Sequence, residues 1–185
     1  MERLKHTVLV LAVVVTGIVA TAVPASAAER RFDFYHIISG SSGLCLSNLN
    51  QNGRIVQDHC KAIGEDGVEE QLWTWQQVAG DNMWKIRNFQ YVNTCISTLN
   101  GGLGYGTPLE MWGCTSSRKT LRWNFLPLSD PLWRIKCPWN NGCFEIVRPS
   151  GVGAAVVLGE TNWDTPDEVW QMRRVGSKTI PVLPY

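Results

Sequence analysis

The sequence predicts an all-β domain built from three copies of one structural unit, and three observations support this prediction. Landmark residues recur in the same order at intervals of about 49 residues. Apolar and charged residues alternate within the copies, which is the period of a half-buried strand. Turn-forming Asn-Gly pairs recur along the chain. Because a unit this short cannot bury its apolar face alone, the three copies are expected to share one core.

Three kinds of landmark define the repeat. Each copy opens with an aromatic residue, a basic residue and an isoleucine, continues through a cysteine, and closes on a tryptophan. The opening tripeptides are Tyr35–Ile37, Trp84–Ile86 and Trp133–Ile135, the cysteines are Cys45, Cys95 and Cys143, and the closing tryptophans are Trp73, Trp123 and Trp170. The copies span about residues 34–80, 81–129 and 130–175. Since the opening aromatic residues and the closing tryptophans recur in every copy, we expect both sets to form the shared core.

Short strands and tight turns are expected within each copy. Segments 84–87 and 133–136 alternate apolar and charged residues, and segment 109–111 alternates in the same way. Beyond the N-terminal segment, no window carries a helical apolar stripe longer than about two turns. The Asn-Gly turn signals stand at residues 52–53, 100–101 and 141–142.

The N-terminal segment 1–27 has the order of a secretory signal peptide. Arg3 and Lys5 precede an apolar run over residues 8–20, and Ala25–Ala27 follows as a small-x-small cleavage site. We expect cleavage after Ala27. An uncleaved anchor helix is the alternative, but the run is short for a span of about 20 residues and a proline interrupts it.

The remaining chain suits one domain over residues 28–175, followed by a tail over 176–185 that we expect to be flexible or to lie on the surface. There are 17 Lys and Arg against 16 Asp and Glu, a formal net charge of +1. This balance lacks the basic footprint of nucleic-acid binders. No membrane span is expected after cleavage, and we expect an extracellular monomer.

All six cysteines follow the signal peptide, and an exported chain meets an oxidising compartment, so disulfides are expected. The repeat pairs Cys45 with Cys60 and Cys95 with Cys114, each within one copy. In the third copy the partner position falls near Thr161, which leaves Cys137 as the available substitute for Cys143. No C-x-x-C pair exists and few histidines remain, so neither a metal nor another cofactor is predicted.

The repeats resemble the ricin-type β-trefoil lectin domain. Ser42–Leu46 matches the Gly-x-Cys-Leu start of that family, and Gln71–Trp73 matches its closing Gln-x-Trp, which is degraded at residues 121–123 and 168–170. The resemblance covers about residues 34–175. It implies a β-trefoil, in which a six-stranded barrel is capped by three hairpins, and it implies a sugar pocket in each copy.

In this family a pocket combines an acidic residue after the first Cys, an aromatic residue two positions before the second Cys, and polar residues before the closing Trp. The first copy has Ser47 and Asp58 at the acidic and aromatic positions, so its stacking platform is missing. The third copy has an acid, Glu145, and the polar residue Asp167, but Gly159 stands at the aromatic position.

The second copy has Ser97 at the acidic position and Trp112 at the aromatic position, with Glu110 and Thr120 as nearby polar groups. It is therefore the best candidate from sequence, although Trp112 could instead cover the Cys95–Cys114 bridge. Tyr105 follows a glycine-rich loop and could line this pocket or serve as an ordinary strand-entry aromatic.

The carbohydrate-binding residues predicted in this way are Ser97, Tyr105, Glu110, Trp112, Thr120, Glu145 and Asp167.

Two functions follow from these residues. The first is a secreted, non-catalytic, lectin-like module with degenerate sugar pockets, whose partner is a glycan or glycoprotein. The second is a protein-binding trefoil, of the toxin-subunit or inhibitor kind, whose sugar sites have been lost; Trp139 and Trp163 lie outside the repeated positions and could form its exposed surface. An enzyme is not predicted, because Asp58 and His59 are adjacent on a strand and point to opposite faces.

Overall fold

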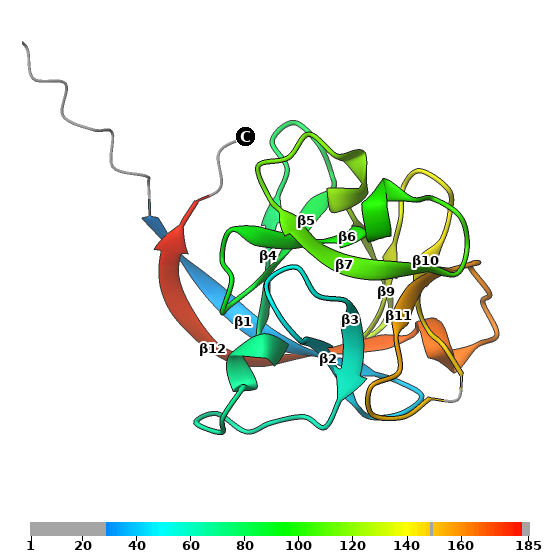
Figure 1. The fold of residues 1–185 in the computed structure, drawn as a ribbon, viewed down its shortest axis with the longest axis horizontal. Coiled ribbons are helices and arrows are strands. Elements are labelled where there is room, and N and C mark those ends of the chain that lie inside the picture. The colour runs from blue at the N-terminus through cyan, green and yellow to red at the C-terminus, as the bar shows by residue number, and fades with distance from the viewer. Residues whose placement is uncertain (1–28, 149, 183–185) are drawn as a thin grey trace, which may run out of the picture.

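The computed structural model describes residues 29–148 and 150–182, and among these it contains strands and short 3-10 turns but no α-helix (Figure 1). The signal peptide predicted at residues 1–27 lies outside the described residues. The strands are β1 (Glu29–Ser39), β2 (Cys45–Asn48), β3 (Ile55–Asp58), β4 (Trp73–Gln77), β5 (Trp84–Asn88), β6 (Thr94–Thr98), β7 (Thr107–Gly113), β8 (Asn124–Ser129), β9 (Leu132–Lys136), β10 (Cys143–Ile146), β11 (Val156–Gly159) and β12 (Trp170–Pro181). The 3-10 turns are η1 (Val68–Gln71), η2 (Leu99–Gly101), η3 (Lys119–Leu121) and η4 (Pro166–Glu168).

Six of these strands close into a barrel in which each neighbour is antiparallel. The order is β1, β4, β5, β8, β9 and β12, and β12 pairs with β1 to complete the circle. The three copies repeat one pairing, in which an opening aromatic residue stands opposite a closing tryptophan. The pairs are Tyr35 with Trp73, Trp84 with Trp123, and Trp133 with Trp170. Closure leaves the barrel without an exposed sheet edge.

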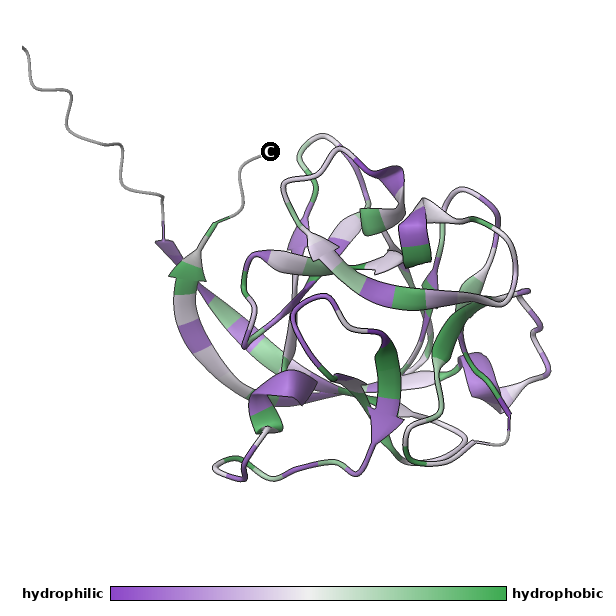
Figure 2. Cartoon of the chain, in the orientation of Figure 1, coloured by the Kyte–Doolittle hydropathy of each residue, from purple (hydrophilic) through white to green (hydrophobic). Residues whose placement is uncertain are grey.

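The other six strands form three hairpins that cap the barrel: β2–β3, β6–β7 and β10–β11. Apolar and polar residues alternate along β7 (Figure 2), whereas nearly every residue of the other hairpin strands is buried. Bridges also join the hairpins to one another, through Val157 and Pro108 and through Val56 and Ala155. The predicted fold class, an all-β domain of the β-trefoil type, is confirmed.

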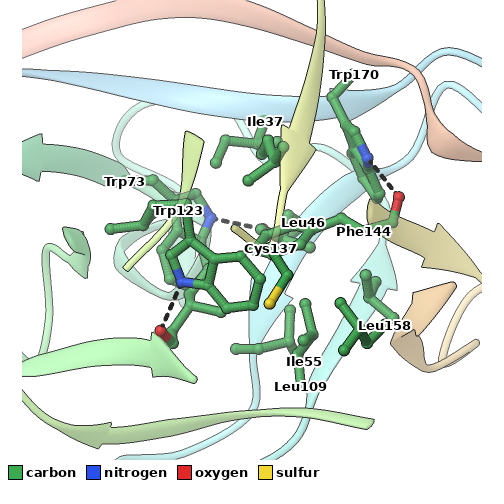
Figure 3. Close-up of a cluster of buried hydrophobic side chains, with 14 of the residues drawn as sticks. Ile37, Leu46, Ile55, Trp73, Leu109, Trp123, Cys137, Phe144, Leu158 and Trp170 are labelled. Atoms are coloured by element: carbon green, nitrogen blue, oxygen red, sulfur yellow. Dashed lines mark hydrogen bonds between the residues drawn. The ribbon is translucent and has the colours of Figure 1, made fainter. Parts of the chain in front are cut away.

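The core is organised around the three closing tryptophans, all of which are fully buried. Each indole N–H donates to the backbone carbonyl of the residue after a first cysteine: Trp73 to Leu46 at 2.9 Å, Trp123 to Ile96 at 2.9 Å, and Trp170 to Phe144 at 3.1 Å (Figure 3). These bonds satisfy the one polar atom of each ring. They also tie every hairpin to the barrel in the same way.

The opening aromatic residues differ from the prediction that they belong to the buried core. Tyr35, Trp84 and Trp133 are only partly buried. Each precedes by two residues an isoleucine that is fully buried, and the hairpin follows that isoleucine along the chain. The three rings therefore face the end of the barrel away from the hairpins, where no hairpin covers them.

Residues 176–181, which belong to the tail expected to be flexible or to lie on the surface, continue strand β12. They pair with residues 29–34 of β1 in a two-stranded ribbon that extends beyond the barrel (Figure 1). Arg174 is bound to Asp33 at 2.9 Å, and Phe32 and Ile180 pack into a second apolar cluster beside the barrel. The ribbon is thus held by its own hydrogen bonds and by buried apolar side chains.

Two of the three expected disulfides are present, Cys45–Cys60 and Cys95–Cys114. The expected Cys137–Cys143 bridge is not formed, and both cysteines are buried thiols. Cys137 points into the barrel core (Figure 3), whereas the Cys143 sulfur lies 3.3 Å from Thr161 Oγ1, the residue at the missing partner position. The two sulfur atoms therefore have different neighbours: the apolar core surrounds Cys137, and Thr161 lies beside Cys143.

His36 on β1 gives the fold a pH dependence that can be measured. It is buried, and its Nδ1 accepts a hydrogen bond from Arg173 at 3.1 Å. Burial, and secondarily the charge of Arg173, lowers the pKa of His36 below its usual 6.5. The unfolded chain therefore binds a proton at a higher pH than the folded chain does. We expect the free energy of unfolding to fall as the pH drops from 6.5 through the lower pKa of the folded state.

Urea unfolding at several pH values between 7.5 and about 5 measures this effect. The variant His36→Gln should lose stability less steeply over the same interval. Equal slopes in the wild type and the variant would show that His36 does not contribute.

Candidate functional site

The third copy forms a polar surface pocket of about 490 Å³ between β10 and the loop that follows β11. Glu145 lines it from β10, and the loop supplies Thr161, Asn162 and Trp163 among other residues. The pocket thus combines a carboxylate with an indole. Neighbouring residues fix the position of each group.

Glu145 owes its position to Gly159 on the neighbouring strand. Its carboxylate and Cβ lie where a side chain on residue 159 would stand, so that only glycine leaves room for them. Burial raises the pKa of Glu145 above its usual value, and the negative charge of Asp167 raises it further. Gly159, which stands where ricin-type lectins have an aromatic residue, therefore leaves the space that the Glu145 carboxylate occupies.

Trp163 is 62% exposed, yet its backbone is firmly held. The Arg134 guanidinium lies 4.5 Å from the centre of its ring and donates to the carbonyl oxygens of Asn162 at 3.1 Å and Trp163 at 3.0 Å. Arg134 in turn pairs with Glu168 at 3.4 Å, and both side chains are almost completely buried. Glu168 also accepts the Asn162 backbone N–H at 2.9 Å. A buried ion pair thus fixes the loop that presents the indole.

The first copy achieves the same loop contact with a single amide. Gln71 Oε1 accepts the Lys61 backbone N–H at 2.9 Å, and its Nε2 donates to the His59 carbonyl at 2.8 Å. Glu168 stands at the position of Gln71 in the repeat. In the third copy two side chains share these roles: Glu168 accepts a backbone N–H of the loop, and Arg134 donates to the loop carbonyls.

Asp167, which was predicted as a pocket residue, is buried on η4 and accepts a hydrogen bond from Arg148 at 2.7 Å. Its backbone N–H donates to Thr165 Oγ1. It does not line the pocket, but its charge acts on Glu145. Asp167 is therefore a buried neighbour of the pocket and not one of its lining residues.

The predicted polar residues of the second copy are already engaged with other groups of the protein. Ser97 and Thr120 are buried, with their hydroxyl oxygens 2.9 Å apart. Glu110 is buried as well, accepts the Asn100 backbone N–H at 3.0 Å, and pairs with Arg118 at 3.3 Å.

Trp112 packs against the Cys95–Cys114 bridge, and the Arg118 guanidinium lies 3.6 Å from the centre of its ring. The position expected to stack on a sugar is therefore in contact with a disulfide and an arginine. Of the two alternatives for Trp112, a ligand platform and a disulfide cover, this contact favours the second.

Tyr105 lies away from the other second-copy residues. It is 50% exposed, and its hydroxyl donates to the Asn140 carbonyl of the third copy at 3.1 Å. In the first copy Ser47 is buried and Asp58 accepts the His59 backbone N–H. Neither arrangement forms a pocket like that of the third copy.

Sequence reasoning missed that Trp163 shares a pocket with Glu145, and it missed the role of Arg134 and Glu168. The repeat alignment carried the signal for the last of these, because Glu168 replaces Gln71. No linear spacing places Trp163, since its loop lies outside the repeated positions.

Within the described residues, no group of three or more His, Cys, Asp or Glu side chains could hold a metal ion. Within the same residues, no helix is long and apolar enough to cross a membrane.

No protein-family model matches the sequence, and no curated protein matches it. Solved structures do match. The designed threefold-symmetric protein ThreeFoil is 15% identical with a TM-score of 0.66, and the match covers 76% of this chain and 97% of that one. The ricin B-like lectin of Macrolepiota procera, solved with lactose, is 17% identical with a TM-score of 0.62, and the match covers 76% and 94%. A chain of the cytolethal distending toxin of Actinobacillus actinomycetemcomitans is 18% identical with a TM-score of 0.61, covering 82% and 94%.

These likenesses establish a fold, the β-trefoil of ricin B-like lectins. At such low identities they carry no residue roles.

Proposed function

We propose that this protein is an exported, non-catalytic carbohydrate-binding module whose best-formed sugar site is the pocket of the third copy. One observation carries the proposal: Glu145 and the exposed ring of Trp163 line the same pocket. A pyranose ring has a CH-rich face that packs on an indole and hydroxyl groups that donate to a carboxylate. The fold, which ricin B-like lectins share, agrees with this chemistry.

The contacts favour the third copy over the second. Trp112 packs against the Cys95–Cys114 bridge and Arg118 and is partly buried, whereas Trp163, although Arg134 contacts its ring, is 62% exposed. The polar groups near Trp112 are already engaged in a hydrogen bond and an ion pair. In the third copy the loop is fixed by the buried pair of Arg134 and Glu168 before any ligand arrives. Pre-organisation of this kind lowers the entropy cost of binding.

Glu145 shares the pocket with two further carboxylates, Glu160 and Asp164, whereas Asp167 is buried and bound to Arg148. Export agrees with the two disulfides, which persist in oxidising compartments.

A glycan array followed by calorimetric titration of the best-bound sugar tests the proposal. We expect Trp163→Ala to weaken binding by about tenfold or more, because the stacking platform is lost. Glu145→Gln should weaken it as well, since a neutral amide accepts weaker hydrogen bonds than a carboxylate does.

Trp112→Phe is the matched control from the second copy and should leave the affinity unchanged. If Trp112→Phe abolishes binding while Trp163→Ala does not, the second copy is the working site. If no glycan is bound at all, the lectin proposal is wrong.

A protein-binding surface is the second candidate, and one observation favours it. Two exposed aromatic side chains meet at the loop over residues 138–142. Trp139 is 40% exposed and donates to the Lys119 carbonyl at 2.9 Å, while Tyr105 is bound to Asn140. A protein partner captured by the wild type and lost in Trp139→Ser, together with an empty glycan array, would favour this function.

A further inference from the structure

A ring of aromatic side chains forms a cup at the end of the barrel away from the hairpins. We call it the barrel-end cup; its cavity has a volume of about 440 Å³. The six barrel strands contribute one side chain each, namely Tyr35, Trp75, Trp84, Phe125, Trp133 and Met172. All six are partly buried and partly exposed. The cup is separate from the third-copy pocket, because the two share no residue.

The cup has walls that stand at steep angles to one another. Phe125 lies at its middle, with Trp84 and Trp133 each 6.4 Å away and inclined at 73° and 88° to it. Trp75 is 5.1 Å from Phe125 at 46°, and Tyr35 stacks on Trp75 at 4.3 Å. A group placed between such walls meets several ring faces at once.

Negative charge is present at the rim. Asp130, in the turn between β8 and β9, lines the cup and is exposed. No ion pair or hydrogen bond engages its side chain anywhere in the described residues. The nearby cation Arg174 is already paired with Asp33. The cup therefore offers ring faces, which are electron-rich, and one carboxylate.

We propose that the barrel-end cup binds a trimethylammonium group. Such a group presents methyl surface on all sides and carries a positive charge that it cannot lose. Aromatic faces attract it through their quadrupoles, and the attraction is greatest where water is excluded. Asp130 supplies the opposite charge at the opening.

A sugar fits this cup less well. Its hydroxyl groups would need partners, yet apart from Asp130, the Tyr35 hydroxyl and the indole N–H groups the side chains of the lining are apolar. A hydroxyl group buried without a partner costs about 1–3 kcal/mol. Rings inclined at steep angles to one another also surround a compact, rounded group more completely than they surround a flat pyranose ring. The charged, hydroxyl-free headgroup is the ligand chemistry that this lining favours.

The test uses matched probes on the whole protein. Choline and its neutral isostere 3,3-dimethyl-1-butanol have the same shape and differ in charge. Nine tryptophans give indole N–H resonances that NMR can follow. We expect choline to bind saturably, to shift the resonances of Trp75, Trp84 and Trp133, and to bind about tenfold more tightly than the isostere.

Two variants locate the site. Asp130→Asn should weaken choline binding and leave binding of the isostere unchanged, because only the charged contact is removed. Trp133→Leu should abolish choline binding, and its circular dichroism spectrum should match the wild type if the fold is intact. Asp164→Asn, a change of an exposed acid in the third-copy loop, is the matched control and should have no effect.

Vesicles distinguish the source of the headgroup. Binding to phosphatidylcholine but not phosphatidylglycerol vesicles, lost in Trp133→Leu, would assign the group to a lipid, whereas binding of free choline alone would assign it to a soluble ligand. Equal affinity for choline and its isostere, or no binding of either, would overturn the proposal. It would also be overturned if a glycan shifts the indole resonances of the same three tryptophans without displacing choline or the isostere. Loss of glycan binding in Trp163→Ala has no bearing on this result, so the two proposals fail independently.

Discussion

Replacing Trp123 with alanine is expected to lower the free energy of unfolding by about 3–5 kcal/mol, the range for deleting a large buried aromatic side chain. Trp123 is fully buried at the centre of the barrel and packs edge-to-face on Phe144 at 4.6 Å. The change leaves a cavity that all three copies border, and the Ile96 carbonyl loses its indole donor. Chemical denaturation of both proteins measures the difference.

Two controls separate the parts of this effect. Trp123→Phe retains most of the ring and removes the N–H, so we expect a smaller loss, of about 1–3 kcal/mol. Trp139→Ala removes a partly exposed tryptophan and should cost less than about 1 kcal/mol. An unfolding midpoint of Trp123→Ala equal to that of Trp139→Ala would contradict the shared tryptophan core.

Replacing Arg134 with methionine is expected to cost about 3–5 kcal/mol, because it leaves a buried carboxylate without its counter-charge. Arg134 and Glu168 are both almost completely buried, 3.4 Å apart. The carbonyl oxygens of Asn162 and Trp163 lose their donor at the same time. The loop that presents Trp163 should therefore loosen, and sugar affinity should fall together with stability.

Neutralising the remaining carboxylate tests the cause. Adding Glu168→Gln to Arg134→Met should recover part of the loss, since an amide at this position resembles Gln71 of the first copy. Burial raises the pKa of Glu168 above its usual value. The ionised form of Glu168 is thus less favourable in the folded protein than in the unfolded chain. The loss of unfolding free energy in Arg134→Met should therefore shrink as the pH falls toward the pKa that Glu168 has in the unfolded chain. A deficit that is independent of pH would show that lost packing, and not the buried charge, is the cause.

The candidate site shows how far sequence reasoning reaches. Glu145 was found because it stands at a repeated position, directly along the strand from Cys143. Trp163 is an unexplained tryptophan in the sequence, because Asp66 and Ser116, which stand equally far before the closing tryptophans of the other two copies, are not aromatic. Trp112 stands at the expected aromatic position, but the sequence does not show that Arg118 folds back over its ring. The partners of a long polar side chain such as arginine depend on which residues lie near it in the folded protein, and the spacing of residues along the sequence does not specify them.

The sequence by itself determined the three copies, the strand-rich fold, the tryptophan core and the two disulfides within copies. These features repeat at a constant interval, and each depends on local alternation or on equivalent positions, which a linear pattern records. Only the tertiary structure decided that Cys137 and Cys143 stay apart, that residues 176–181 join a ribbon with β1, and that the opening aromatic residues line a cup. Those outcomes depend on which end of the barrel is covered and on which segments distant in the chain become neighbours. Both aromatic sets repeat equally well in the sequence, so only the closed barrel decides that the closing tryptophans are fully buried and the opening aromatic residues are not.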